Sequence, residues 1–108
     1  MEKLKIYISI PITGKDYKKQ REHADDIARS LSRQGWDVVN PFNIYAGKNA
    51  TYEDHIAFDL RALMDCDAIV MCKGWEHSFG CTLEYSYAQL CKRYQRKDFK
   101  LFLEQELN

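Results

Sequence analysis

The strongest constraint on the fold is the alternation of four short apolar runs with three longer amphipathic segments. The runs cover residues 4–10, 36–39, 67–71 and 100–103 and are rich in β-branched, aliphatic and aromatic side chains, as buried strands are. The order strand, helix, strand, helix, strand, helix, strand predicts right-handed crossovers and a mostly parallel sheet with helices on both faces. A chain of 108 residues has the length of one α/β domain.

The amphipathic segments are predicted to be helices because their apolar residues recur at helical spacing. The first, closed by Gly35, has the stripe Ala24, Ile27, Ala28 and Leu31. The second has the stripe Ile56, Leu60, Leu63 and Met64, with Thr51 as its N-cap and Asp54 three residues later. The third runs to about Arg96 with the stripe Leu83, Tyr87, Leu90, Cys91 and Tyr94. Residues 42–50 are too polar and glycine-containing for a regular element and are expected to form a loop over the sheet edge.

Charge and cysteine content narrow the function classes. Sixteen basic and sixteen acidic residues give a formal net charge of zero, which does not favour a nucleic acid polymer as partner. The four cysteines show neither C-x-x-C pairing nor histidine spacing, so neither a metal site nor a disulfide framework is indicated. Cys66, Cys72 and Cys91 are expected to pack in the core. With no signal-peptide or membrane-spanning stretch, we expect a cytoplasmic protein without membrane contact.

The segment 74–84, GWEHSFGCTLE, is the first candidate for a functional site. It lies between an apolar run and a helix, and in an open α/β sheet ligands usually bind at such carboxyl-edge junctions. Gly74 and Gly80 allow its backbone to approach a ligand closely. Glu84 is expected in or near the first helical turn, where the helix dipole favours an ionised carboxylate. It is a candidate nucleophile or cation stabiliser, although a glutamate there can equally serve only its own helix.

The same segment offers a possible phosphate site. Backbone N–H groups at a helix start attract anions such as phosphate, and beside them lie Ser78, His77 and Thr82. There is no lysine at P-loop spacing, so the loop is not a Walker motif. His77 is a candidate general acid or an idle surface residue. Trp75 either stacks on a base or covers the core.

Two further residues have a chemical and a structural interpretation. Asp59 falls beside the stripe of the second helix and is either a functional carboxyl or a solvated one. Cys81 lies at a helix start that would lower its pKa, although inert packing is the simpler interpretation.

Three segments together resemble the nucleoside 2-deoxyribosyltransferase superfamily. They are YISIPITG at 7–14, DLRALMDCDAIV at 59–70 and GWEHSFGCTLE at 74–84. The chain is most similar to the branch of short bacterial and phage domains, and it resembles the 2′-deoxynucleoside 5′-phosphate N-hydrolases. The resemblance covers nearly the whole chain and implies a flavodoxin-like three-layer fold with four or five strands in the order of about 2-1-3-4.

The resemblance also implies an activity. It implies cleavage of the N-glycosidic bond of a (deoxy)nucleoside 5′-monophosphate, with Glu84 as nucleophile. Asp59 is implied as proton donor to, or orienter of, the leaving base, and Tyr7 as a hydrogen-bonding partner. An oxocarbenium-like transition state calls for such a pair of carboxyl groups. Ser78 stands where the hydrolases carry a phosphate-contacting serine and the transferases carry aspartate. The implied substrate-binding residues are Ser78, Gly80, Ile10, Pro11, Ile12, Gly14 and Trp75.

The resemblance leaves three functions to be distinguished: a nucleotide hydrolase, a deoxyribosyltransferase and a non-catalytic nucleotide sensor. Ile10 replaces a glycine usual in the family, and its β-branched side chain is expected to affect how closely a ligand approaches the first loop. No metal or organic cofactor is implied. Relatives complete each site with a residue from a neighbouring subunit, so a homodimer or larger homo-oligomer is expected, with Tyr85, Ser86 and Tyr87 in its contact.

Overall fold

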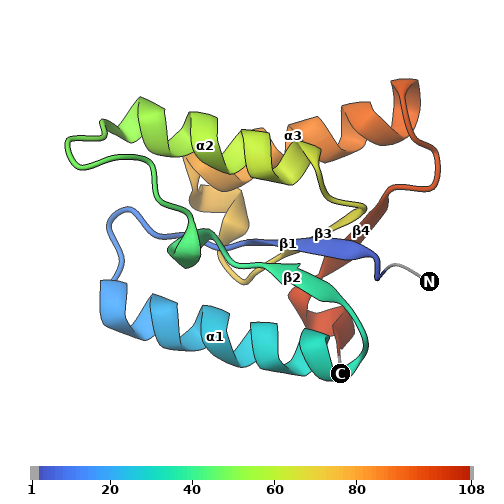
Figure 1. Cartoon of the computed structure of the whole chain (residues 1–108), viewed down its shortest axis with the longest axis horizontal. Helices are drawn as coiled ribbons and strands as arrows, with labels where there is room; N and C mark the ends of the chain where they lie inside the picture. The colour runs from blue at the N-terminus through green and yellow to red at the C-terminus, as the bar shows by residue number, and fades with distance from the viewer. Residues whose placement is uncertain (1–2, 108) are drawn as a thin grey trace.

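The computed structural model describes residues 3–107 and has three layers, with one sheet between two layers of helices. The strands β1 (Lys5–Ser9), β2 (Asp37–Val39), β3 (Ala68–Met71) and β4 (Lys100–Leu103) form a parallel sheet in the order β2-β1-β3-β4. Helix α1 (Tyr17–Arg33) covers one face, and α2 (Tyr52–Met64) and α3 (Phe79–Tyr94) cover the other (Figure 1). The flavodoxin-like α/β prediction and its strand order are confirmed.

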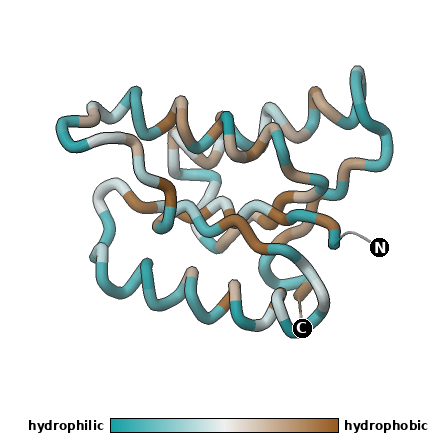
Figure 2. The backbone as a smooth tube through the Cα atoms, in the orientation of Figure 1, coloured by the Kyte–Doolittle hydropathy of each residue, from teal (hydrophilic) through white to brown (hydrophobic). Residues whose placement is uncertain are grey.

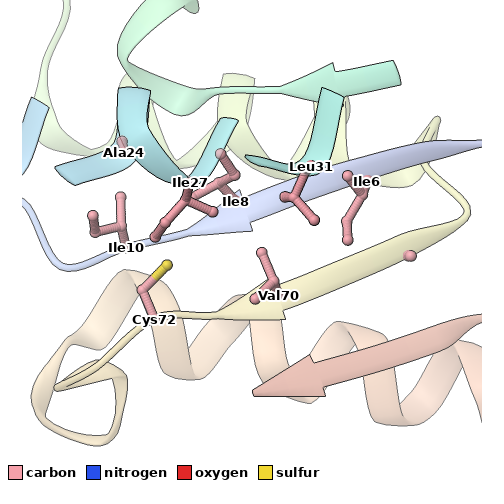
Figure 3. Close-up of a cluster of buried hydrophobic side chains, with 9 residues drawn as sticks. Ile6, Ile8, Ile10, Ala24, Ile27, Leu31, Val70 and Cys72 are labelled. Atoms are coloured by element: carbon pink, nitrogen blue, oxygen red, sulfur yellow. The ribbon is translucent and has the colours of Figure 1, made fainter. Parts of the chain in front are cut away.

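The two faces of the sheet bury different side chains because successive strand residues point to opposite sides. The even-numbered residues Ile6, Ile8 and Ile10 pack with Ala24, Ile27 and Leu31 of α1 (Figure 3). Tyr7, the neighbour of these isoleucines, belongs instead to the cluster under α2 and α3, with Leu63, Ile69, Met71 and Ala88. Figure 2 shows hydrophobic residues concentrated along the central strands and hydrophilic residues along most of α1. The side of β1 that faces α3 therefore carries Tyr7.

Helix ends follow their local sequence. The hydroxyl of Thr51 accepts a hydrogen bond from the Asp54 N–H at 3.1 Å, and the Asp54 carboxylate accepts one from the Thr51 N–H at 2.9 Å, so the predicted capping pair is a complete capping box. Gly35 adopts φ 98° just after α1, a left-handed conformation that glycine tolerates. The expected loop after β2 begins with a short 3-10 helix, η1 (Pro41–Asn43), where the Asn40 side chain caps the Phe42 N–H.

Two predicted helix stripes are partly wrong. In α3 the fully buried residues are Cys81, Glu84, Ala88 and Cys91, whereas Leu90 and Tyr94 are 56% and 69% exposed. In α2, Leu63 is buried as expected but Met64 is 55% exposed. Helix α3 carries apolar residues on two sides, and helical spacing alone does not show which side faces the sheet. The small residues Cys81 and Ala88 face the sheet and Tyr85 and Tyr87 pack beside them, whereas Leu90 and Tyr94 face outward.

Candidate functional site

A cavity of about 290 Å³ opens at the carboxyl edge of the sheet. It lies where β1 ends, beside η1, the first half of α2 and the start of α3. Its lining residues are Tyr7, Ile10, Ile12, Thr13, Tyr17, Pro41, Phe42, Ile44, Tyr52, His55, Ile56, Asp59, Ser78, Gly80, Cys81 and Glu84. The volume is close to the lower end of the range of about 300–1,000 Å³ that is typical of small-molecule sites.

The Glu84 carboxylate is held in this cavity by two hydroxyl groups of β1. The Tyr7 hydroxyl donates to Oε2 at 2.6 Å and the Ser9 hydroxyl donates to Oε1 at 2.7 Å. Tyr7 and Ser9 point to the same side because they are two residues apart in a strand, and both are fully buried. Glu84 itself is 7% exposed. Each carboxylate oxygen therefore has a fixed, charge-assisted hydrogen bond, which orients the whole group.

Helix α3 presents Glu84 to β1 because its inward face is made of small side chains. Ser78 caps the helix by accepting a hydrogen bond from the Cys81 N–H at 3.2 Å. Cys81, one turn before Glu84, and Ala88, one turn after it, are buried against the sheet and let the helix lie close to it. The cap fixes the residue at which the helix begins. It thereby fixes the position of Glu84 along the helix axis relative to Tyr7.

The charge state of Glu84 differs from the sequence-based expectation. The helix begins at Phe79, so Glu84 lies in its second turn rather than at its positive end. The pKa of Glu84 is raised to about 7, mainly by burial; the Tyr7 and Ser9 hydroxyls oppose this rise, and the negative charge of Asp59 adds to it. The expectation that this position favours an ionised carboxylate is corrected, because the loss of water outweighs the two hydrogen bonds. Near neutral pH, Glu84 is poised between its protonated and ionised forms.

Asp59 supplies a second carboxyl to the same cavity. It lies on α2, half-buried, and burial raises its pKa to about 7. Two hydroxyl donors favour the ionised form of Glu84. For Asp59, burial disfavours the ionised form. Of the two carboxyls, Glu84 is thus the better nucleophile and Asp59 the better proton donor. The pair meets the requirement for opposite roles in acid and base chemistry.

The structure brings most, but not all, of the predicted site residues together. Glu84, Asp59, Tyr7, Ser78, Gly80, Ile10 and Ile12 line the cavity, whereas Pro11, Gly14 and Trp75 are not among its lining residues. The Trp75 ring stacks on Tyr85 at 4.5 Å between centroids and packs against the core under α3. The Ile10 side chain is 5% exposed and lies in the cluster beneath α1 (Figure 3). Most of its bulk therefore fills the core on the side of β1 away from Glu84.

Sequence reasoning missed several residues of the site. Ser9 is the most important, and its signal was the two-residue spacing from Tyr7 at the end of a buried strand. His55 lines the cavity from one turn before Asp59, a spacing that places both on one side of α2. Tyr17 and Phe42 contact each other edge to face at 5.1 Å on the cavity wall. They come from different elements, so no local pattern links them.

The structure favours the simpler interpretations of Cys81 and His77. Cys81 is buried and its pKa is raised by burial, so it is not activated by its place at the helix start. All four cysteines are free and buried, which confirms the core positions expected for Cys66, Cys72 and Cys91. His77 belongs to the short 3-10 helix η2 (Trp75–His77) and is exposed; it is not among the residues that line the cavity.

Among residues 3–107, no group of three or more histidine, cysteine, aspartate or glutamate side chains is placed to hold a metal ion. No helix in the same range combines the length and the apolar character needed to cross a membrane.

Comparison with known proteins shows the family of the chain. No curated protein matches it. The model of a family described as "Domain of unknown function (DUF4406)" matches residues 4–94, which include every element from β1 to α3 and every lining residue of the cavity. The chain belongs to the DUF4406 family.

Proposed function

We propose that the protein is an N-glycosidase that releases the base from a (deoxy)nucleoside 5′-monophosphate. The observation that carries the proposal is the pair of carboxyl groups in one small cavity, Glu84 fixed by the Tyr7 and Ser9 hydroxyls and Asp59 beside it with a raised pKa. Glycosidic bond cleavage needs one carboxylate at the anomeric carbon and one acid at the leaving group. The resemblance of segments 7–14, 59–70 and 74–84 to deoxyribosyltransferases gives this pair the same two roles.

The proposed reaction has two steps. The ionised Glu84 attacks the anomeric carbon, the bond from that carbon to the base nitrogen breaks, and the base takes a proton from Asp59. A water molecule then attacks the same carbon, Asp59 takes a proton from that water, and the sugar phosphate leaves with Glu84 restored as a carboxylate. The Tyr7 and Ser9 hydroxyls orient Glu84 throughout, and burial raises the pKa of Tyr7 well above its usual value, so it remains a donor.

The remaining walls of the cavity suit the other parts of a nucleotide. Ser78 accepts a bond from the Cys81 N–H, which leaves its own proton free to donate to a phosphate oxygen. The N–H groups of the first turn of α3, including that of Gly80, add the positive end of the helix dipole. Apolar side chains of Phe42, Ile44 and Ile56 offer a surface for the flat base.

Release of free base from a panel of ribo- and deoxyribonucleoside 5′-monophosphates, followed by chromatography, tests the proposal. The wild type is expected to release base, and so is the control Glu76→Gln, which alters an exposed glutamate of η2. Glu84→Gln keeps the side-chain shape but removes the nucleophile, and is expected to lose activity by several orders of magnitude. Binding of nucleotide without release would identify a sensor instead. Exchange of one base for another in preference to hydrolysis would identify a transferase.

A further inference from the structure

The charged groups of the cavity do not by themselves suit a phosphate. Two of them, Asp59 and Glu84, are carboxyl groups, and the third, His55, can take up a proton on its imidazole ring. No lysine or arginine is among the described residues that line the cavity. An anion that leaves water for such a cavity needs a positive partner close by. His55 is the side chain of this wall that can supply one.

His55 lies beside the start of α3 because the first turns of α2 and α3 pack against each other. The centroids of the Tyr52 and Phe79 rings are 6.5 Å apart. The Ile56 side chain lies close to Gly80, since a Cβ added to that glycine would be 4.0 Å from Cδ1 of the isoleucine. His55 stands between Tyr52 and Ile56 in the sequence and lines the cavity. It therefore faces the part of the cavity where the N–H groups of the first turn of α3 lie.

The imidazole of His55 is not engaged by a carboxylate of its own helix. The side chain is exposed, and none of the ion pairs within residues 3–107 includes it. The acidic residues of the same turn, Glu53 and Asp54, are not among the residues that line the cavity. The Asp54 carboxylate accepts a hydrogen bond from the Thr51 N–H instead. His55 is therefore available to a ligand.

The two helices divide the cavity into two levels. His55 and Gly80 belong to the first turns of α2 and α3, and Asp59 and Glu84 follow them by four residues each, about 6 Å further along the helix axes. The helices lie side by side on one face of the sheet (Figure 1). The carboxyl groups that carry the proposed reaction therefore share the inner level. His55 shares the outer level with the N–H groups at the start of α3.

We propose that His55 selects substrates with a 5′-phosphate, its imidazole N–H donating to one phosphate oxygen while the Ser78 hydroxyl and the Gly80 N–H bind others. The inference rests on the proposed function, which places the phosphate at the start of α3, and it adds a specificity-determining residue on α2. A hydrogen bond between a protonated imidazole and a phosphate is charge-assisted and stronger than a neutral one. A nucleoside without phosphate gains nothing from His55, so the residue discriminates between the two substrates.

Binding of a sugar phosphate tests His55 without any catalysis and without a base. The probes are ribose 5-phosphate and 2-deoxyribose 5-phosphate, and calorimetry is done just below neutral pH, where an imidazole carries its charge. His55→Gln keeps a donor but removes the charge, and is expected to weaken binding of the better probe about 10- to 100-fold. His55→Lys restores a positive charge and is expected to bind within a few-fold of the wild type. His77→Gln alters an exposed histidine outside the cavity and is expected to have no effect.

Base-release kinetics give a second readout that separates binding from chemistry. In His55→Gln the KM of a nucleoside 5′-monophosphate is expected to rise about 10- to 100-fold, with kcat and the release from the matching nucleoside nearly unchanged. A wild type that binds the sugar phosphate through His55 but releases no base would refute the proposed function and leave this inference standing. Sugar-phosphate binding that is equal in wild type and His55→Gln, or undetectable in the wild type at millimolar concentrations, would overturn it. Equal losses for nucleotide and nucleoside would assign His55 to the base and overturn it as well.

Discussion

Removing one hydroxyl from the carboxylate site gives a direct test of how Glu84 is held. Tyr7→Phe keeps the ring in the core and deletes the donor that lies 2.6 Å from Oε2 of Glu84. A hydrogen bond to a charged group contributes about 1.5–3 kcal/mol, and each change of one in pKa corresponds to about 1.36 kcal/mol. The substitution is therefore expected to raise the pKa of Glu84 from about 7 to about 8 or 9. Asp59 and the burial of the site are unchanged, so no opposite shift is expected.

The rise in pKa has a consequence for the proposed reaction. At pH 7 the ionised fraction of Glu84 falls from about one half to between about a tenth and a hundredth. If the ionised form is the nucleophile, base release at pH 7 falls about 5- to 50-fold. Raising the pH toward 9 ionises Glu84 again but is not expected to restore activity, because Asp59, with a pKa of about 7, then has no proton to donate to the leaving base.

The assay follows the carboxyl group itself and does not require activity. The ¹³C-NMR signal of Glu84 in glutamate-labelled protein is assigned by its disappearance in Glu84→Gln and is then titrated from pH 4 to pH 10. Tyr85→Phe is the matched control, since Tyr85 neighbours Glu84 in sequence while its hydroxyl accepts a bond from Gln89 instead. A titration midpoint of Glu84 that stays the same or falls in Tyr7→Phe would refute the reasoning.

Three further predictions concern stability and the second carboxyl. The pKa of Glu84 is about 7 in the folded protein, above its usual value of 4.5, so the protonated group stabilises the fold at low pH. This contribution of Glu84 to the unfolding free energy falls by about 3 kcal/mol as the pH rises from 4.5 to 7. In urea titrations, the unfolding free energy of Glu84→Gln relative to that of the wild type should therefore rise by this amount between pH 4.5 and pH 7. Unfolding free energies of the two proteins that change in parallel with pH would contradict this prediction. Asp59→Asn should slow release of ordinary bases far more than that of activated leaving groups, and equal slowing would exclude Asp59 as the proton donor. Thr51→Ala should lower the unfolding free energy by about 0.5–2 kcal/mol without changing the Glu84 titration, because it removes only the cap of α2.

The fold could be predicted because its signals are local. Each strand is a short apolar run, and each helix end carries a side chain or glycine that acts within a few residues, such as Thr51 for α2 and Gly35 for α1. The parallel sheet then follows from the alternation of the elements. The elements and their order are confirmed, and the errors concern which side of a helix faces inward, as at Met64 and Leu90.

The site could be predicted only in part because its geometry combines distant segments. Glu84 and Asp59 were candidates from their positions in the sequence. The hydroxyls that hold Glu84, however, belong to Ser9 and Tyr7, which precede it by 75 and 77 positions. The balance between burial and hydrogen bonding also depends on the packed structure. The helix dipole alone predicted an ionised Glu84, whereas burial in the folded chain raises its pKa to about 7.

The error at α3 has a physical origin in the carboxylate site. A helix that covers a sheet needs one apolar side, yet α3 has two, and the sequence pattern does not rank them. The sheet selects the side with small residues, because only these let Glu84 come within 2.7 Å of the β1 hydroxyls. The larger residues Phe79, Leu90 and Tyr94 then lie on other sides of the helix, where they are 65%, 56% and 69% exposed. The requirement for a close approach at the site therefore explains why the side of α3 that helical spacing alone favoured is the outward one.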